Sequence, residues 1–163
     1  MKTESSNSRH ACEIDTGRRV ALRYVTGLVV GALAGPVSAR ERTPEIVQPR
    51  TAGRESFMER AFEMRRRAIE RGDQPYGAIV VKGGRIVGEG VSAVVTDNDP
   101  TAHAEMQAIR DAARRLGTSD LTSCEMYGTS RACPMCEAGA YWARIARMYY
   151  GTSIADAGAP RLP

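Results

Sequence analysis

Four side chains in the second half of the chain are of types that can bind a metal ion or move a proton. His103 and Glu105 lie two residues apart in the stretch TAHAE, and Cys133 and Cys136 enclose a proline and a methionine in the stretch CPMC. Taken alone, the cysteine pair is compatible with a redox couple, half of a structural zinc knuckle or part of a catalytic metal site. The histidine and the glutamate favour the third interpretation, because a redox couple would leave them without a role.

One imidazole and two thiolates form a ligand set that suits zinc. If His103, Cys133 and Cys136 converge, they leave the fourth tetrahedral position to water, which is typical of a catalytic zinc and not of a structural one. Zinc lowers the pKa of bound water to about 7, so hydroxide is available at neutral pH. Glu105 would face the open position and carry the proton from this water to the substrate.

The elements that must position these residues can be read from hydrophobic periodicity and from turn residues. The spacing predicts a helix over residues 54–71, a hairpin of strands 76–81 and 85–95 turning at Gly83 and Gly84, a helix over 101–116 capped by Thr101, a strand over 124–130, a helix over 134–145 and a strand over 147–153. This order predicts a layered α/β domain. Both motifs lie where a helix begins after a strand, so both should reach the same edge of the sheet.

The two motifs together resemble the zinc-dependent cytidine deaminase superfamily. HAE followed about thirty residues later by CPMC matches its signature. The stretches DPTAHAE, QPYGAIVVKGG and CPMCEAGAYWARI resemble its guanine deaminase and nucleoside deaminase branch. The resemblance covers roughly residues 55–152.

The resemblance implies a three-layer fold with a mixed sheet flanked by helices. It also implies that His103, Cys133 and Cys136 bind Zn²⁺, that Glu105 is the general acid and base, and that the reaction is hydrolytic loss of ammonia from a nucleobase. Trp142 would form part of the wall around the base, and the protein would be a homodimer.

Three departures from the family pattern concern the substrate more than the chemistry. Arg131 and Ala132 stand where relatives usually have glutamate and proline, and Ser92 stands where they usually have an asparagine that binds the substrate. Serine is shorter and lacks the amide, which can change specificity. The chain also ends soon after the strand at 147–153, so we expect a shortened C-terminus without the family's fifth strand and closing helices.

The preferred function is deamination of a purine base or nucleoside, guanine to xanthine first, with a small molecule as the substrate. Deamination of cytosine-type bases is the next alternative, followed by a tRNA adenosine deaminase and by a non-catalytic zinc-binding remnant. Five of the 23 basic and three of the 19 acidic side chains lie in residues 1–39. The rest is close to neutral, which does not favour a nucleic-acid partner.

Residues 1–39 have the layout of a secretory signal. Arg18 and Arg19 precede the apolar stretch VTGLVVGALAGPV, and small residues precede a cleavage point after Ala39. The paired arginines resemble a twin-arginine signal, which predicts export to the periplasm, with a cytoplasmic protein as the alternative. The apolar stretch is too short to favour a membrane span.

Residues 40–52 are predicted to be a linker and residues 53–163 the deaminase domain. Because an oxidising compartment promotes disulfides, we expect zinc to be loaded before export and to protect the cysteines.

Overall fold

The computed structural model describes residues 44–162, and the predicted signal, residues 1–39, lies outside this range. In chain order the elements are α1 (Arg54–Glu70), β1 (Gly77–Lys82), β2 (Arg85–Val91), α2 (Ala104–Leu116), β3 (Cys124–Gly128), α3 (Pro134–Trp142), β4 (Arg147–Tyr150) and β5 (Ala155–Gly158). Within residues 44–162 no helix is both long enough and apolar enough to cross a membrane.

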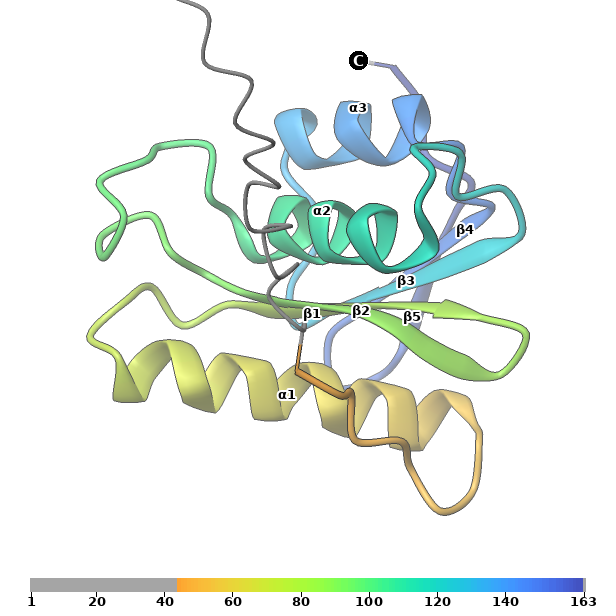
Figure 1. Cartoon of the computed structure of the whole chain (residues 1–163), viewed down its shortest axis with the longest axis horizontal. Helices are drawn as coiled ribbons and strands as arrows, with labels where there is room; N and C mark the ends of the chain where they lie inside the picture. Colours follow the sequence, from red (N-terminus) through yellow and green to blue (C-terminus); the bar gives the residue numbers. More distant parts are fainter. Residues whose placement is uncertain (1–43, 163) are drawn as a thin grey trace, which may run out of the picture. The chain divides into compact units, whose positions relative to one another are not determined.

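The strands form one mixed sheet in the order β2-β1-β3-β4-β5. β1 pairs antiparallel with β2 and β3, β3 pairs parallel with β4, and β4 pairs antiparallel with β5. The parallel pair is joined through α3, as a parallel connection requires a crossover. Figure 1 shows α1 on one face of the sheet and α2 with α3 on the other, which confirms the predicted three-layer α/β fold.

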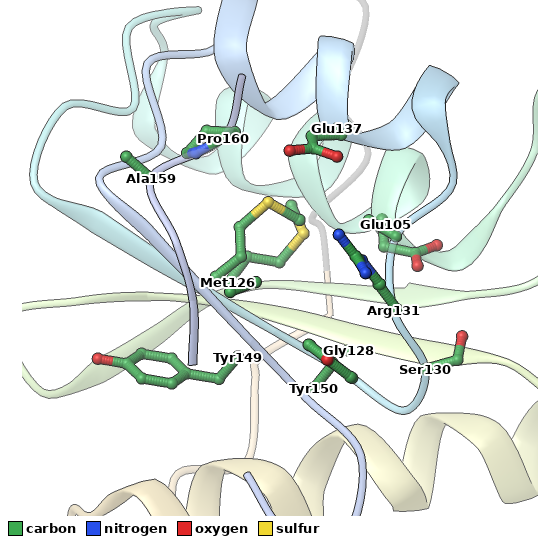
Figure 2. Close-up of a pocket in the computed structure, with 13 residues that line it drawn as sticks. Glu105, Met126, Gly128, Ser130, Arg131, Glu137, Tyr149, Tyr150, Ala159 and Pro160 are labelled. Atoms are coloured by element: carbon green, nitrogen blue, oxygen red, sulfur yellow. The ribbon is translucent and has the colours of Figure 1, made fainter. Parts of the chain in front are cut away.

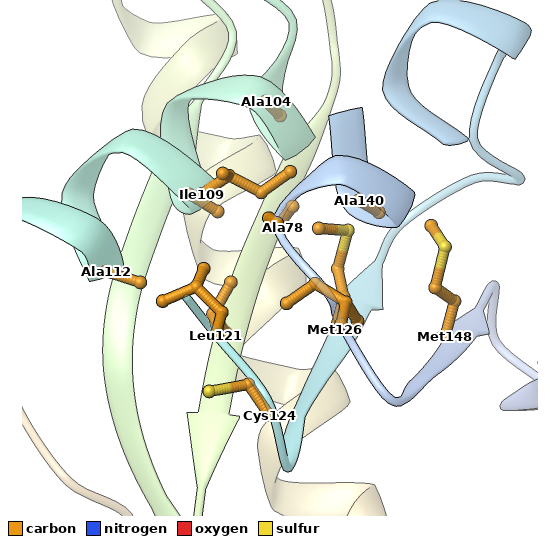
Figure 3. Packing of buried hydrophobic residues seen from close by; sticks show 13 residues of the cluster. Ala78, Ala104, Ile109, Ala112, Leu121, Cys124, Met126, Ala140 and Met148 are labelled. Atoms are coloured by element: carbon orange, nitrogen blue, oxygen red, sulfur yellow. The ribbon is translucent and has the colours of Figure 1, made fainter. Parts of the chain in front are cut away.

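The interior strand β1 is buried on both faces and therefore divides the core in two. Ala78 and Val80 belong to the cluster under α2 and α3, part of which Figure 3 shows, whereas Ile79 and Val81 belong to the cluster under α1. This alternation explains why the strand is an uninterrupted apolar run. The second cluster also holds Tyr127, whose ring stacks on that of Tyr149 at a centroid distance of 4.9 Å.

Glycines in β2 let α2 approach the sheet very closely. A Cβ atom at Gly90 would lie 1.9 Å from the carbonyl oxygen of Ala104, and one at Gly88 would lie 2.5 Å from that of Ala108. Alanines recur at every fourth position along this face of α2, so both partners are small. This contact fixes the depth at which the N-terminal end of α2 lies on the sheet.

Several boundaries and one element differ from the sequence predictions, and α3 and β4 each end three residues earlier than predicted. α2 begins at Ala104 and not at Thr101, whose hydroxyl donates instead to Asp99 Oδ1 at 2.8 Å. β2 ends at Val91, because the following residues turn away into the loop that leads to α2. The expectation of no fifth strand was wrong: Ala155–Gly158 forms β5 at the edge of the sheet.

The described part of the predicted linker, residues 44–52, packs on the domain. Ile46 is buried in the cluster under α1. The side-chain amide of Gln48 donates to the carbonyl oxygen of Ile86 and accepts from its N–H, both at 2.8 Å. The guanidinium of Arg115 donates to the carbonyl oxygen of Pro44 at 2.7 Å.

Candidate active site

The three predicted metal ligands lie at the beginnings of two helices. His103 is the N-cap residue of α2, and Cys133 is the N-cap residue of α3, with Pro134 in the first helical position. Cys136 follows in the first turn of α3 and is completely buried. The free N–H groups and the dipole at a helix N-terminus favour negative charge, so both helices support thiolates here.

The ligand atoms are spaced as a tetrahedral zinc site requires. His103 Nδ1 lies 3.7 Å from Cys133 Sγ and 3.6 Å from Cys136 Sγ, and all three atoms lie within 4.8 Å of one another. Standard Zn–N and Zn–S bonds at tetrahedral angles separate ligand atoms by about 3.5–3.8 Å. The structure therefore brings His103, Cys133 and Cys136 together as predicted.

The chemistry of the donors also fits a cation. Burial and the neighbouring Glu105 carboxylate raise the pKa of the Cys136 thiol well above its usual range. The thiolate form therefore needs a positive charge beside it, which Zn²⁺ would supply. Of the described residues, these three form the one group of His, Cys, Asp or Glu side chains with this metal-binding spacing.

Glu105 lies beside the metal ligands in the first turn of α2. Its side chain is only 6% exposed, and its Oε2 lies 3.6 Å from Cys136 Sγ. Burial raises the pKa of the Glu105 carboxyl, and a backbone hydrogen bond, Cys136 and His103 oppose this only in part. A carboxyl group whose pKa is raised is better suited to accept a proton and to return it during a reaction.

A pocket opens next to Glu105. Figure 2 shows Glu105, Arg131 and Glu137 along its lining. Ala157, Ala159 and Pro160 line it from the C-terminal segment. The backbone N–H of Arg161 donates to Glu137 Oε1 at 3.3 Å, which ties this segment to α3.

Two predicted substrate residues do not line this pocket. Ser92 is 1% exposed, and its hydroxyl donates to Asp73 Oδ1 at 2.8 Å. Trp142 is 72% exposed and lies beside Tyr141 near the end of α3, where it borders a different hollow.

Three polar residues of the site were not assigned a role from the sequence. Arg131 was noted only as a departure from the family pattern, yet its side chain lines the pocket. Glu137 directly follows Cys136, so its place in the first turn of α3 was a usable signal. Asp73 carried no signal, because all its hydrogen-bond partners except the adjacent Gln74 lie 19 to 23 residues further along the chain.

Comparison with known proteins identifies the family. The family model described as "Cytidine and deoxycytidylate deaminase zinc-binding region" matches residues 52–152. The chain is 42% identical over 104 residues to a guanine deaminase of Bacillus subtilis, covering 63% of this chain and 67% of that protein. It is 43% identical over 98 residues to a tRNA-specific adenosine deaminase of Aquifex aeolicus, covering 60% and 65%. The chain thus spans about two thirds of the length of these relatives.

Solved structures agree with the sequence comparison. The crystal structure of the Bacillus subtilis guanine deaminase superposes with a TM-score of 0.59 at 42% identity, over 61% of this chain and 64% of that one. A structure from a study of A-to-I editing by tRNA:A34 deaminases superposes with a TM-score of 0.57 at 42% identity, over 58% and 69%. The matched family region and the grouped histidine and cysteines lead to one conclusion: the chain belongs to the cytidine and deoxycytidylate deaminase family of zinc-binding proteins.

Proposed function

We propose that the protein catalyses the hydrolytic deamination of a purine base or nucleoside, with guanine as its first substrate. The observation that carries this proposal is that the buried Glu105 carboxylate contacts Cys136, one of the three metal ligands, and also lines the pocket. A proton carrier in this position can serve a molecule in the pocket and a nucleophile at the metal site in turn.

The chemistry follows from the residues of the chain. His103, Cys133 and Cys136 would hold zinc, which supplies a nucleophile from water at neutral pH. Glu105 Oε2 would accept one proton of the attacking water and deliver it to a ring nitrogen, and would then pass the second proton, from the added hydroxyl, to the departing amine. The new C–O bond replaces the C–N bond, so water is consumed, ammonia leaves and guanine becomes xanthine.

The pocket supports a small purine over a tRNA. Its wall includes Ala157–Pro160 of the same chain, which limits the space beside Glu105. Arg131 contributes guanidinium N–H donors, which match the O6 and N7 acceptors of guanine, whereas adenine carries an amino group at its sixth position. The chain after residue 39 is close to neutral, whereas a tRNA-binding protein needs a basic surface.

A tRNA adenosine deaminase is the second candidate, because the identity to the Aquifex aeolicus enzyme, 43%, is as high as the 42% identity to the guanine deaminase. Adenosine within a tRNA loop would have to enter the same pocket as a flipped base.

The decisive experiment is a substrate panel with the zinc-loaded protein. Ammonia release is measured with guanine, guanosine, adenine, adenosine, cytosine and cytidine, and inosine formation is measured with a tRNA transcript. We expect release from guanine, with the rate falling by about 10²-fold or more in Glu105→Gln, while the zinc content of the variant remains that of the wild type.

Other outcomes would select other functions. Inosine in the tRNA without ammonia from free guanine would favour the tRNA candidate. A protein that holds one zinc per chain and is inactive on every substrate would be a non-catalytic zinc-binding remnant.

A further inference from the structure

The carboxylate of Asp73 collects five hydrogen bonds just before β1. Oδ1 accepts from the Ser92 hydroxyl at 2.8 Å and from the N–H of Gln74 at 2.7 Å. Oδ2 accepts from the N–H of Val95 at 2.9 Å, from the N–H of Thr96 at 2.8 Å and from the Thr96 hydroxyl at 3.0 Å. Four of these donors belong to the loop between β2 and α2.

This loop ends at a metal ligand. The N–H of Ala93 donates to the carbonyl oxygen of Ala102 at 3.0 Å, which closes the loop on itself one residue before His103. The N–H of Ser92 donates to the carbonyl oxygen of Tyr76 at 3.2 Å, which ties the loop to the segment that follows Asp73. The position of His103 therefore depends on how Asp73 holds Ser92 and Thr96.

The same short segment also holds the loop that carries the cysteines. The N–H of Gly77 donates to the Thr129 hydroxyl at 3.1 Å, and the N–H of Thr129 donates to the carbonyl oxygen of Gly77 at 3.0 Å. Thr129 precedes Cys133 by four residues. Residues 73–77 thus act as a brace between two loops. Asp73 holds the loop that leads to His103, and Gly77 holds the loop that leads to Cys133.

The brace depends on the negative charge of Asp73. Burial works to raise the pKa of its carboxyl, but the hydrogen bonds from Thr96, Ser92 and Gln74 outweigh burial and hold the pKa well below its usual range. A carboxylate accepts at both oxygens, whereas an asparagine would turn an NH₂ group toward N–H and hydroxyl donors. No other described side chain supplies the acceptors that these four loop donors use.

We propose that Asp73 is a positioning residue of the metal centre, which sets His103 against Cys133 and Cys136 through residues 73–77 and through the loop that it holds. Ser92 serves this brace and not the substrate. The inference goes beyond the proposed function, because it concerns ligand placement and requires no particular substrate.

The test compares zinc affinity with stability. Zinc affinity is measured by competition with a chromophoric chelator, and the melting temperature of the metal-free protein is measured separately, for wild type, Asp73→Asn and Asp111→Asn. Asp111 is a matched control: it is similarly buried and accepts from the N–H of Glu89 at 3.0 Å and from Arg115 at 2.8 Å, far along α2 from the ligands.

We expect Asp73→Asn to weaken zinc binding by about ten- to a hundredfold, as loss of an outer-shell partner does. Asp111→Asn should lower the melting temperature of the metal-free protein while leaving zinc affinity within about threefold of the wild type. Equal zinc affinity in Asp73→Asn and wild type would reduce Asp73 to a purely structural role and overturn the proposal.

Milder variants keep the test decisive if Asp73→Asn does not fold. Ser92→Ala and Thr96→Val each remove one donor to Asp73, and each should weaken zinc binding by a smaller factor; unchanged affinity in both would overturn the proposal. Failure of the proposed function leaves these results intact, since no substrate is used.

Discussion

Arg131 brings a positive charge to a pocket that otherwise contains the carboxylates of Glu105 and Glu137. Within residues 44–162 its guanidinium makes no ion pair shorter than 4.0 Å with a carboxylate. Its donors are therefore available to a ligand. A guanidinium that pairs with two acceptors of guanine discriminates by about 1–3 kcal/mol against a base that lacks them.

Arg131→Met should therefore lower kcat/KM for guanine by about ten- to a hundredfold. The value for 2-aminopurine, which lacks the 6-oxygen, should change much less, because that base offers Arg131 only one of the two acceptors. Steady-state kinetics with both bases measure the difference. Arg85→Met is the matched control, since Arg85 is exposed at the β1–β2 hairpin and does not line the pocket. An equal loss of kcat/KM with both bases would show that Arg131 does not recognise the oxygen at the sixth position of guanine.

At this scale the grouping of His103, Cys133 and Cys136 could be predicted, whereas the positions of Ser92 and Trp142 away from the pocket were not predicted. His103, Cys133 and Cys136 are recognised by type and spacing, and the start of each helix places them. The partner of Ser92 lies 19 residues away across a tertiary contact, which no local pattern reveals. The exposure of Trp142 could have been predicted from the sequence. Cys136, Ala140 and Ala143 mark the buried face of α3, and helical periodicity places Trp142 away from that face.

The contact between β2 and α2 connects the sheet to the active site. Gly88 and Gly90 face the alanines of α2, whose first turn holds Glu105 next to His103. Helix depth at this point therefore sets where the ligand and the proton carrier lie. The glycines of β2 could be interpreted from the sequence only as strand residues, because nothing local shows which helix lies above them.

Gly90→Ala should destabilise the protein and displace the active site. The new Cβ would lie 1.9 Å from the carbonyl oxygen of Ala104 and 2.5 Å from the N–H of Ala108, and backbone cannot yield as a side chain can. Overpacking of this kind costs about 1–3 kcal/mol or more, which denaturant unfolding measures, and zinc affinity should fall as well. Gly53→Ala, whose Cβ would come no closer than 3.6 Å to Glu55, is the control with a smaller effect. Equal losses in the two variants would contradict this account.

Among the strands, too, some could be predicted from local sequence, whereas another forms only through tertiary contacts. β1, β3 and β4 are apolar or aromatic and were predicted, because such residues favour buried strands. β5 has the sequence ADAG, whose composition does not favour a strand. It forms because the edge of β4 offers free N–H and C=O groups to the returning chain.

At the scale of the whole molecule, metal binding and folding should be coupled. The ligands lie at the beginnings of two helices, so zinc would join parts of the chain that are 30 and more residues apart. A ligand that binds only the folded state stabilises it by about 2.7 kcal/mol when its free concentration is a hundred times Kd.

Removal of zinc with a chelator should therefore lower the melting temperature by about 10 °C. The shift should grow with free zinc concentration in the wild type, as differential scanning fluorimetry can follow. His103→Ala removes a ligand and should abolish most of this dependence. A melting temperature that does not respond to zinc in the wild type would mean that the three side chains do not form a tight metal site.

The two bonds between Gln48 and Ile86 have a further consequence. β2 is an outer strand of the sheet, and an outer strand can template pairing with another polypeptide. The Gln48 amide occupies both backbone groups of Ile86, and Asp111 occupies the N–H of Glu89. The Gln48 side chain thus takes the place of a neighbouring strand at Ile86 and blocks the pairing of another polypeptide with this edge of the sheet. A truncation that removes Gln48 would expose this edge of the sheet again. The shortened form of this protein that aggregates least should therefore begin before residue 44 and not at the first helix.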